Sequence, residues 1–130
     1  MPIDATLPYD DQNIFARILR GEIPSTRVYE DDHAVAFHDI APAAPVHILV
    51  IPRGRYVSWD DFSAHASEAE IAGFIRAIGR VARDHQLVAP GYRILANVGA
   101  HGGQEVPHLH VHLFGGRPLG PMLAGQAAGG

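Results

Sequence analysis

The chain has 130 residues, of which 47% are hydrophobic and 18% are charged, and its formal net charge at pH 7 is −4. This length and balance predict one globular domain with its own core and exclude a disordered chain. The acidic balance excludes a broad basic surface for nucleic acid, and the absence of cysteine excludes disulfides and thiol catalysis.

The two ends of the chain are predicted to lie outside the domain. Residues 1–12 are acidic and lack the apolar segment of a secretory signal, so we expect a flexible leader and a cytoplasmic protein. The longest apolar run, residues 43–52, is interrupted by His47 and is too short to cross a bilayer, so we expect no membrane partner. Residues 119–130 are rich in Gly and Ala and predict a mobile tail. The domain is therefore expected at residues 13–118.

The first half of the domain predicts a short helix followed by strands. Asn13 is a suitable N-cap for a helix that continues to Arg20, because the apolar residues between them form one stripe and Gly21 follows. Period-two and continuous apolar patterns then predict strands, with Asp31-Asp32 as the turn of a hairpin between the first two. These strands are expected at residues 27–30, 34–38 and 46–51.

The second half predicts one long helix. After a loop that contains residues 59–61, Ser67 and Glu70 form a capping-box pattern, and apolar residues at helical spacing continue to about Gln86. A further strand is expected at residues 92–97 and a glycine-rich loop at residues 99–103. Strands with hairpin connections, packed against one long and one short helix, indicate an α+β fold.

The last predicted strand contains the residues with the clearest chemistry. In residues 108–113, histidine alternates with an aliphatic residue, which is the period of a strand with one buried face. We therefore expect the three imidazoles on one face. Pro107 fits the first position of the strand, and Gly115 and Gly116 end it. Three imidazoles beside a glycine-rich stretch indicate a site that binds and transfers an anionic group.

Two other interpretations of the histidines remain open. They could form an ordinary exposed polar face, or they could bind a metal. With a rise of ~3.3 Å per residue, the Cα atoms of His108 and His112 lie ~13 Å apart, so the three cannot all reach one ion at ~2.0–2.1 Å. Two of them could, with His47 or a carboxylate added. We expect no metal.

Residues 108–113 resemble the histidine-triad motif of the HIT superfamily, His-φ-His-φ-His-φ with φ apolar. The Gly-Gly-Arg-Pro that follows resembles the Hint branch, the nucleoside phosphoramidases. The resemblance extends in order and spacing over residues 13–24, 36–52 and 91–117. It implies a HIT-like antiparallel sheet of about five strands, and it implies a homodimer.

The resemblance also implies a role for each histidine. His110 is the expected nucleophile, His112 contacts the phosphate and the leaving group, and His108 helps to hold His110 in the right tautomer. His47, on the strand at residues 46–51, joins the relay. Neutral imidazole is a good nucleophile towards phosphorus, and two successive displacements suit it. No metal or organic cofactor is then needed.

A purine nucleotide is the expected ligand. Asp39 matches a carboxylate that accepts hydrogen bonds from both ribose hydroxyls, and Asn97 matches a phosphate-binding asparagine. Backbone N–H groups near Gly103 can approach a phosphate closely because glycine lacks a Cβ. The purine is expected in an apolar slot formed by Phe15, Ile18, Phe37, Ile40 and Leu49. Further nucleotide contacts are expected from Gly103, Gln104, Glu105 and Val106.

The chain departs from the animal Hint proteins at two places. Glu105 stands where they have a serine, and the tail lacks their tryptophan-containing ending. Both leave the choice of leaving group open. The expected function is hydrolysis of the P–N bond of purine nucleoside 5′-phosphoramidates through a nucleotidyl-histidine intermediate. The alternatives are a Fhit-like dinucleoside polyphosphate hydrolase and a nucleotide- or zinc-binding interaction protein with little turnover.

Overall fold

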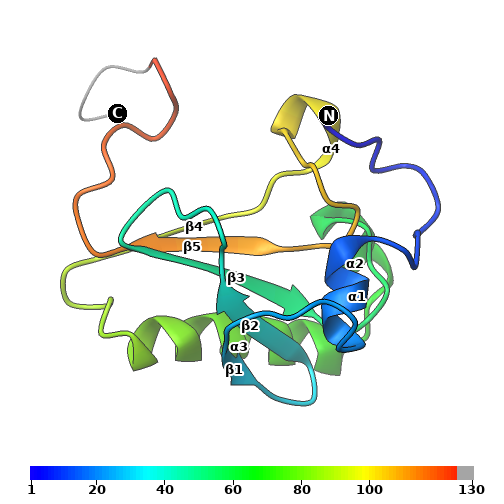
Figure 1. Cartoon of the computed structure of the whole chain (residues 1–130), viewed down its shortest axis with the longest axis horizontal. Coiled ribbons are helices and arrows are strands. Elements are labelled where there is room, and N and C mark those ends of the chain that lie inside the picture. The colour runs from blue at the N-terminus through cyan, green and yellow to red at the C-terminus, as the bar shows by residue number, and fades with distance from the viewer. Residues whose placement is uncertain (126–130) are drawn as a thin grey trace.

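The computed structural model describes residues 1–125, and these residues form the α+β fold expected from the sequence (Figure 1). A five-stranded antiparallel sheet has the strand order β1-β2-β3-β5-β4. The strands are β1 (Arg27–Glu30), β2 (Ala34–His38), β3 (Val46–Pro52), β4 (Arg93–Leu95) and β5 (Val111–Gly115). The helices among the described residues are α1 (Ile14–Leu19), α2 (Trp59–His65), α3 (Glu68–Asp84) and α4 (Gly99–Gly102).

Side chains that cap free amides set the starts of the two predicted helices. The side chain of Asn13 accepts a hydrogen bond from the N–H of Ala16 at 2.9 Å at the start of α1. Ser67 and Glu70 form the complete capping box at the start of α3. Gly21, with φ of +78°, follows α1 in the left-handed region that glycine adopts without strain.

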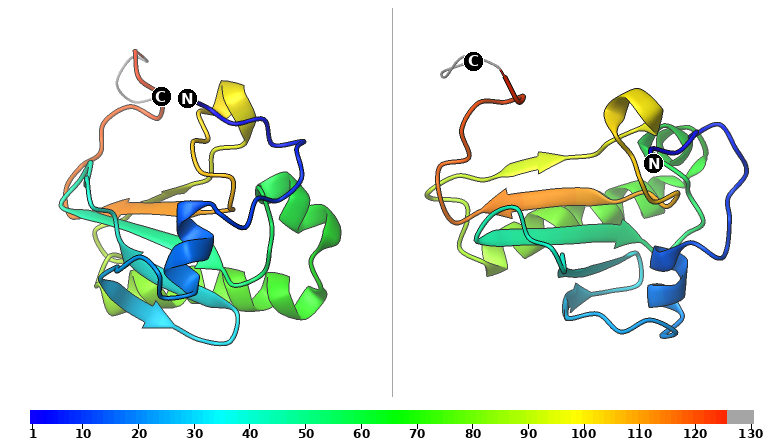
Figure 2. Two further views of the ribbon diagram at one scale, coloured as in Figure 1. Left: turned by 45° about the vertical axis from the view of Figure 1, so that its right-hand side comes forward. Right: turned by 45° about the horizontal axis from the view of Figure 1, so that its top comes forward.

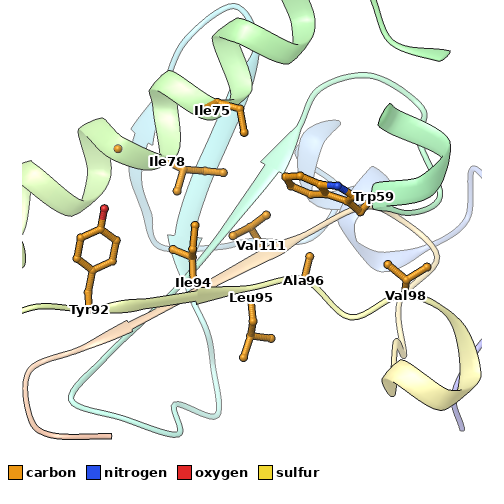
Figure 3. A pocket seen from close by; sticks show the side chains of 10 residues that line it. Trp59, Ile75, Ile78, Tyr92, Ile94, Leu95, Ala96, Val98 and Val111 are labelled. Atoms are coloured by element: carbon orange, nitrogen blue, oxygen red, sulfur yellow. The ribbon is translucent and has the colours of Figure 1, made fainter. Parts of the chain in front are cut away.

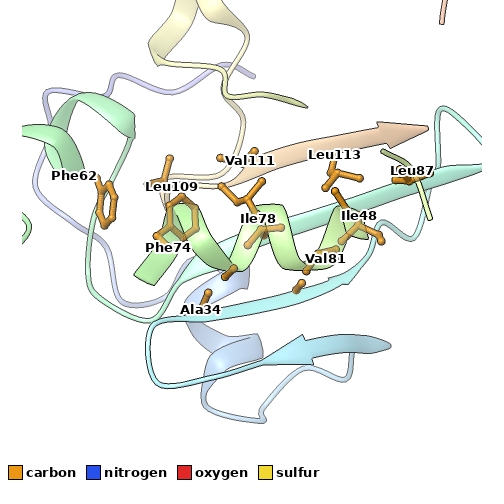
Figure 4. Packing of buried hydrophobic residues seen from close by; sticks show 14 residues of the cluster. Ala34, Ile48, Phe62, Phe74, Ile78, Val81, Leu87, Leu109, Val111 and Leu113 are labelled. Carbon is orange, nitrogen blue, oxygen red and sulfur yellow. The ribbon is translucent and has the colours of Figure 1, made fainter. Parts of the chain in front are cut away.

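The main core lies between the sheet and α3 (Figure 4). Leu109, Val111 and Leu113 point to this side and pack with Phe74 and Val81 of α3, and all five are buried. A fully buried side chain of this kind contributes roughly 1.5–3 kcal/mol. Because the three aliphatic residues are two apart in an extended segment, the histidines between them point to the opposite face.

The opposite face of the sheet is covered in part by α1, and Figure 2 shows α1 and α3 on the two sides of the sheet. Strand β3 contributes to both layers, with Ile48 in the main core and Leu49 in the layer under α1. The buried residues of this second layer are Phe15, Ile18, Val35, Phe37, Leu49 and Ile51. The imidazoles on this face therefore lie beside an apolar layer rather than in bulk solvent.

Two helices were not expected. Residues 59–61 belong to α2, not to a loop, because the Ser58 side chain accepts a hydrogen bond from the N–H of Asp61 and Phe62 is buried. The glycine-rich stretch at residues 99–103 is also not an open loop. It forms the helical turn α4, which Gly103 closes with φ of +79°. The expectation of one long and one short helix is corrected accordingly.

The last strand starts later than expected. Pro107 is not its first residue, since β5 begins at Val111 and pairs there with Val50 of β3. His108 and His110 precede the paired segment, although they keep the alternation of faces. The alternation of apolar residues predicts the direction in which side chains point. The first residue of the strand depends instead on where the neighbouring strand offers backbone hydrogen bonds.

Both ends of the described chain contact the domain. The N–H of Ile3 donates to the carbonyl oxygen of Gln104 at 2.7 Å, and Arg93 donates to the carbonyl oxygen of Gly120 at 3.0 Å. The predicted flexibility of the leader and of the tail stays a prediction, and residues 126–130 of that tail lie outside the described range. None of the described helices has the length and apolar character to cross a membrane.

Candidate active site

Four imidazoles lie together on the α1 side of the sheet. His47, His108 and His110 are buried and His112 is half-buried. The ring centroids of His110 and His112 are 5.1 Å apart, and those of His47 and His112 are 5.2 Å apart. The antiparallel pairing of β3 with β5 brings His47 into the site. His112 lies opposite Leu49 in that ladder, and His47, two residues before Leu49, therefore shares the same face of the sheet. The structure therefore gathers all four histidines singled out in the sequence.

A backbone carbonyl determines which nitrogen of His110 carries the proton. Nδ1 of His110 lies 2.8 Å from the backbone oxygen of His108, and a carbonyl oxygen can only accept a hydrogen bond. The proton of neutral His110 is therefore assigned to Nδ1, and the lone pair to Nε2. The contact is made by the backbone carbonyl of His108, and the role of the His108 side chain stays a prediction.

A backbone amide determines the proton positions of the second pair. The N–H of Ala43 donates to Nδ1 of His47 at 3.0 Å, so the proton of neutral His47 lies on Nε2. This Nε2 lies 2.9 Å from Nδ1 of His112 and 3.5 Å from a carboxylate oxygen of Asp39. His112 then accepts at Nδ1 and carries its own proton on Nε2, where it can donate to a bound molecule.

Burial keeps these imidazoles neutral. It lowers the pKa of His108 to about 4. Burial, reinforced by the neighbouring imidazoles, likewise lowers the pKa of His112 to about 4, although the Asp39 carboxylate opposes this shift. The pKa values of His110 and His47 also fall below the ordinary histidine value because of burial. At pH 7 the site therefore holds neutral imidazoles, the form required of a nucleophile.

Two aromatic residues of the site were missed by the sequence analysis. Phe114 stacks on His112, with the ring planes 3° apart, and its centroid lies 4.3 Å from that of His47. Its position two residues after His112 was a signal, because it continues the alternation that places side chains on this face. Tyr9 approaches His108 from the leader, 99 residues away in the sequence, and no local pattern predicts such a contact.

The predicted purine slot forms only in part. Phe15, Ile18, Phe37 and Leu49 are buried in one cluster, and the Phe15 ring lies 4.9 Å from that of His110. Ile40 does not join them, since 99% of its surface is exposed. Val106 packs against the same cluster. The role of these residues in binding a purine stays a prediction.

The glycine-rich segment is more closed than expected. The N–H of Gly103 donates to the carbonyl of Ala100, and the N–H of Gln104 donates to that of Gly99. The expectation that these two amides are open to a phosphate therefore does not hold in this structure, and contact with a nucleotide through other atoms stays a prediction. Gln104 is itself buried, and its side-chain amide donates to the carbonyl of Val57 at 2.7 Å.

The remaining polar candidates lie on less buried positions. Asp39 is half-buried beside His47 and accepts a hydrogen bond from the N–H of Ala41 at 2.8 Å. Asn97 is half-buried between β4 and α4, and Glu105 is exposed just after α4. Their contacts with ribose, phosphate or leaving group stay predictions.

One set of residues has the geometry of a metal site. Asp39, His47 and His112 each offer a ligand atom, and these atoms all lie within 4.8 Å of one another. Imidazole and carboxylate ligands of this kind are typical of zinc. The set combines one histidine of the triad with His47 and a carboxylate, whereas the sequence suggested two triad histidines with one of the others.

Comparison with known proteins shows the family to which the chain belongs. The HIT domain family model matches residues 20–119. The chain is 65% identical over 115 residues to an uncharacterised 13.2 kDa HIT-like protein of Azospirillum brasilense, covering 88% of this chain and 94% of that protein. It is 47% identical over 114 residues to the purine nucleoside phosphoramidase of Escherichia coli (strain K12), covering 88% of this chain and 95% of that protein.

The likeness extends to a solved structure, that of a HIT family hydrolase from Clostridium thermocellum. It superposes with a TM-score of 0.79 at 38% identity, covering 88% of this chain and 98% of the other. The segment that the family model matches, residues 20–119, includes β1 to β5 and the four imidazoles. The chain therefore belongs to the HIT domain family.

Proposed function

We propose that this protein hydrolyses the P–N bond of purine nucleoside 5′-phosphoramidates through a nucleotidyl-histidine intermediate. The observation that carries the proposal is the 2.8 Å hydrogen bond from Nδ1 of His110 to the backbone oxygen of His108, which leaves the lone pair on Nε2. The similarity to the Escherichia coli purine nucleoside phosphoramidase supports the choice of substrate.

In the first step, Nε2 of His110 attacks the phosphorus and the P–N bond to the amine breaks. The departing nitrogen takes the proton on Nε2 of His112, and the solvent proton that replaces it reaches Nδ1 of His112 through His47, so that Nε2 of His112 is left with a lone pair. The Asp39 carboxylate, 3.5 Å from Nε2 of His47, favours the protonated state of this pair when charge develops there. The amine leaves as a neutral molecule, and the nucleotide stays bound to His110 as a cationic adduct.

In the second step, water attacks the same phosphorus. His112 accepts the proton of this water and passes it through the pair to solvent, and the bond from phosphorus to His110 breaks with its electron pair returning to Nε2. The nucleoside monophosphate is released, and the proton taken up in the first step is given back. The enzyme therefore returns to its starting state without a metal or an organic cofactor.

A comparison of two substrates tests this proposal. The purified protein is incubated in parallel with adenosine 5′-phosphoramidate and with a diadenosine polyphosphate, and AMP is measured. The proposal expects the higher kcat/KM with the phosphoramidate. Faster turnover of the polyphosphate would favour the Fhit-like alternative, and release of AMP from neither would reject both. Location in the cytoplasm stays a prediction.

The geometry of Asp39, His47 and His112 favours zinc binding as a second candidate function. Titration of the protein with zinc, compared with Asp39→Asn, tests it. Binding at micromolar zinc that is lost in the variant supports a metal-binding protein, whereas equal weak binding by both proteins rejects the site. If zinc binds, it occupies the lone pair on Nδ1 of His112 and competes with the hydrogen bond from His47.

We also propose a homodimer. β4 is an edge strand of the sheet, and beside it lies an apolar groove of about 490 Å³ that includes residues of α3 (Figure 3). Ile94, Ile75 and Trp59 are each at least 39% exposed there. An exposed apolar edge of this kind invites pairing with a second chain. A two-fold arrangement would pair the same groove of both copies and bury it.

A further inference from the structure

The leader runs from beside α4 to the start of α1 (Figure 1). In this segment Asp11 forms an ion pair with Arg55 at 3.0 Å, and the Arg55 guanidinium lies over the ring of Tyr9, 5.3 Å from its centroid. The Tyr9 ring meets the His108 ring edge to face, with centroids 5.6 Å apart. The leader thus brings one aromatic side chain against the first histidine of the triad.

The contact between the two residues has a defined donor. Nε2 of His108 lies 2.9 Å from the backbone oxygen of Pro52, so Nε2 carries the proton and Nδ1 carries the lone pair. The hydroxyl of Tyr9 lies 2.6 Å from this Nδ1, and it must therefore be the donor. Burial raises the pKa of Tyr9, so the hydroxyl keeps its proton at neutral pH.

We propose that Tyr9 is a positioning residue of nucleotidyl transfer, because its hydroxyl fixes the His108 ring and thereby the backbone carbonyl that holds Nδ1–H of His110. The reaction in this statement rests on the proposed function. The chain of contacts runs from the Tyr9 hydroxyl to Nδ1 of His108, and from the oxygen of His108 to Nδ1 of His110, at 2.6 and 2.8 Å. Tyr9 touches neither the reacting phosphorus nor Nε2 of His110 in this scheme.

The contact affects the nucleophile because His108 is fully buried. Without the Tyr9 hydroxyl, a buried nitrogen lone pair has no donor, which is costly enough that the ring rotates or admits water. Either response shifts the peptide group of His108 relative to His110. A nucleophile displaced from its attack geometry loses rate steeply, while binding of the nucleotide at other residues is little changed.

The test compares Tyr9→Phe with the matched control Tyr29→Phe. Both variants remove one tyrosine hydroxyl, but that of Tyr29 donates to Asp31 at 2.8 Å on the β1–β2 hairpin. Four quantities are measured: the single-turnover rate of adduct formation with adenosine 5′-phosphoramidate, the affinity for AMP, the thermal midpoint, and the ¹⁵N resonances of the His108 imidazole. Tyr9→Phe is expected to slow adduct formation about 10-fold with AMP affinity unchanged.

The control is expected to keep the wild-type rate, and the Nδ1 resonance of His108 is expected to shift only in Tyr9→Phe. A wild-type rate in Tyr9→Phe, or an equal loss in both variants, would overturn the proposal. The resonance measurement needs no substrate, so it decides the hydroxyl–imidazole contact even if the wild-type protein forms no adduct. Failure of the wild type to form the adduct would instead reject the proposed function.

Discussion

Backbone groups assign the protons of three imidazoles directly and that of the fourth, His112, through His47. The oxygens of Pro52 and His108 can only accept, and the N–H of Ala43 can only donate, so each fixes one histidine tautomer. The result is an unprotonated Nε2 on His110 and a protonated Nε2 on His112, 5.1 Å apart by ring centroid. Since a peptide group does not titrate, this assignment persists over the whole range in which the imidazoles are neutral.

The pH dependence of adduct formation follows from the burial of His110. Burial lowers its pKa below the ordinary value of 6.5, so the neutral nucleophile persists to a lower pH than in an exposed histidine. We expect kcat/KM to stay level as the pH falls from 7 and to decline only below 6.5. The measurement uses an acyl adenylate, because its carboxylate leaves without a proton. An acid limb at or above pH 6.5 would contradict the effect of burial.

The role of Glu105 is decided by its effect on different leaving groups. Its side chain is exposed just before the triad, where the neutral amine, once it takes up a further proton as it departs, could pair with the carboxylate. Glu105→Gln is expected to lower kcat/KM about 5-fold for amine leaving groups and less for acyl phosphates. Glu68→Gln, at an exposed position of α3, serves as the control. An equal loss of kcat/KM with both substrate types would show that Glu105 has only a structural role in its loop.

At the level of helices and strands, sequence patterns predicted the features that depend on neighbouring residues in the chain. The strand limits at residues 27–30 and 34–38 and the capping box of α3 are confirmed. Helix α2 was missed because seven residues make only about two turns, too few for a clear apolar stripe. Helix α4 was missed because glycine suggests an open loop, whereas here Gly103 closes a helical turn.

The site residues were predictable where histidine and aliphatic residues alternate along the strand. They were not predictable where the contact joins residues far apart in the sequence. Period two placed His108, His110 and His112 on one face, and it also applied to Phe114. The sequence could not rank the three histidines, because their tautomers depend on backbone groups brought up by folding. Tyr9 was hidden for the same reason, since its partner lies 99 residues away.

The proposed homodimer can be tested at the edge strand β4. Ile94 is 51% exposed in the apolar groove, so a charge there should prevent two copies from pairing. In sedimentation at micromolar concentration, the wild type is expected at twice the 14.0 kDa of one chain and Ile94→Asp at 14.0 kDa. Leu7→Asp, an exposed apolar position that does not line the groove, should remain dimeric. A wild-type species of 14.0 kDa would reject the dimer.

In the molecule as a whole, the side chains that stabilise the fold and those of the candidate active site lie on opposite faces of the sheet. Residues 108–113 send their aliphatic side chains into the core against α3 and their imidazoles to the side of α1. Substitutions on the core side therefore act through the free energy of unfolding. In the proposed mechanism, substitutions of the imidazoles act on the reaction, with the exception of His108, whose full burial couples it to both the reaction and the free energy of unfolding.

The most direct measurement is the mass of the protein after rapid mixing with adenosine 5′-phosphoramidate and an alkaline quench, followed by peptide mapping. Nucleophilic attack by His110 predicts one AMP attached to His110 of the wild type. It predicts no adduct in His110→Ala, which should keep its affinity for AMP, and partial recovery of turnover when imidazole is added to His110→Gly. An adduct on another residue would contradict it. So would a His110→Ala variant that retains a tenth of wild-type kcat/KM, a loss of only ~1.4 kcal/mol of transition-state stabilisation.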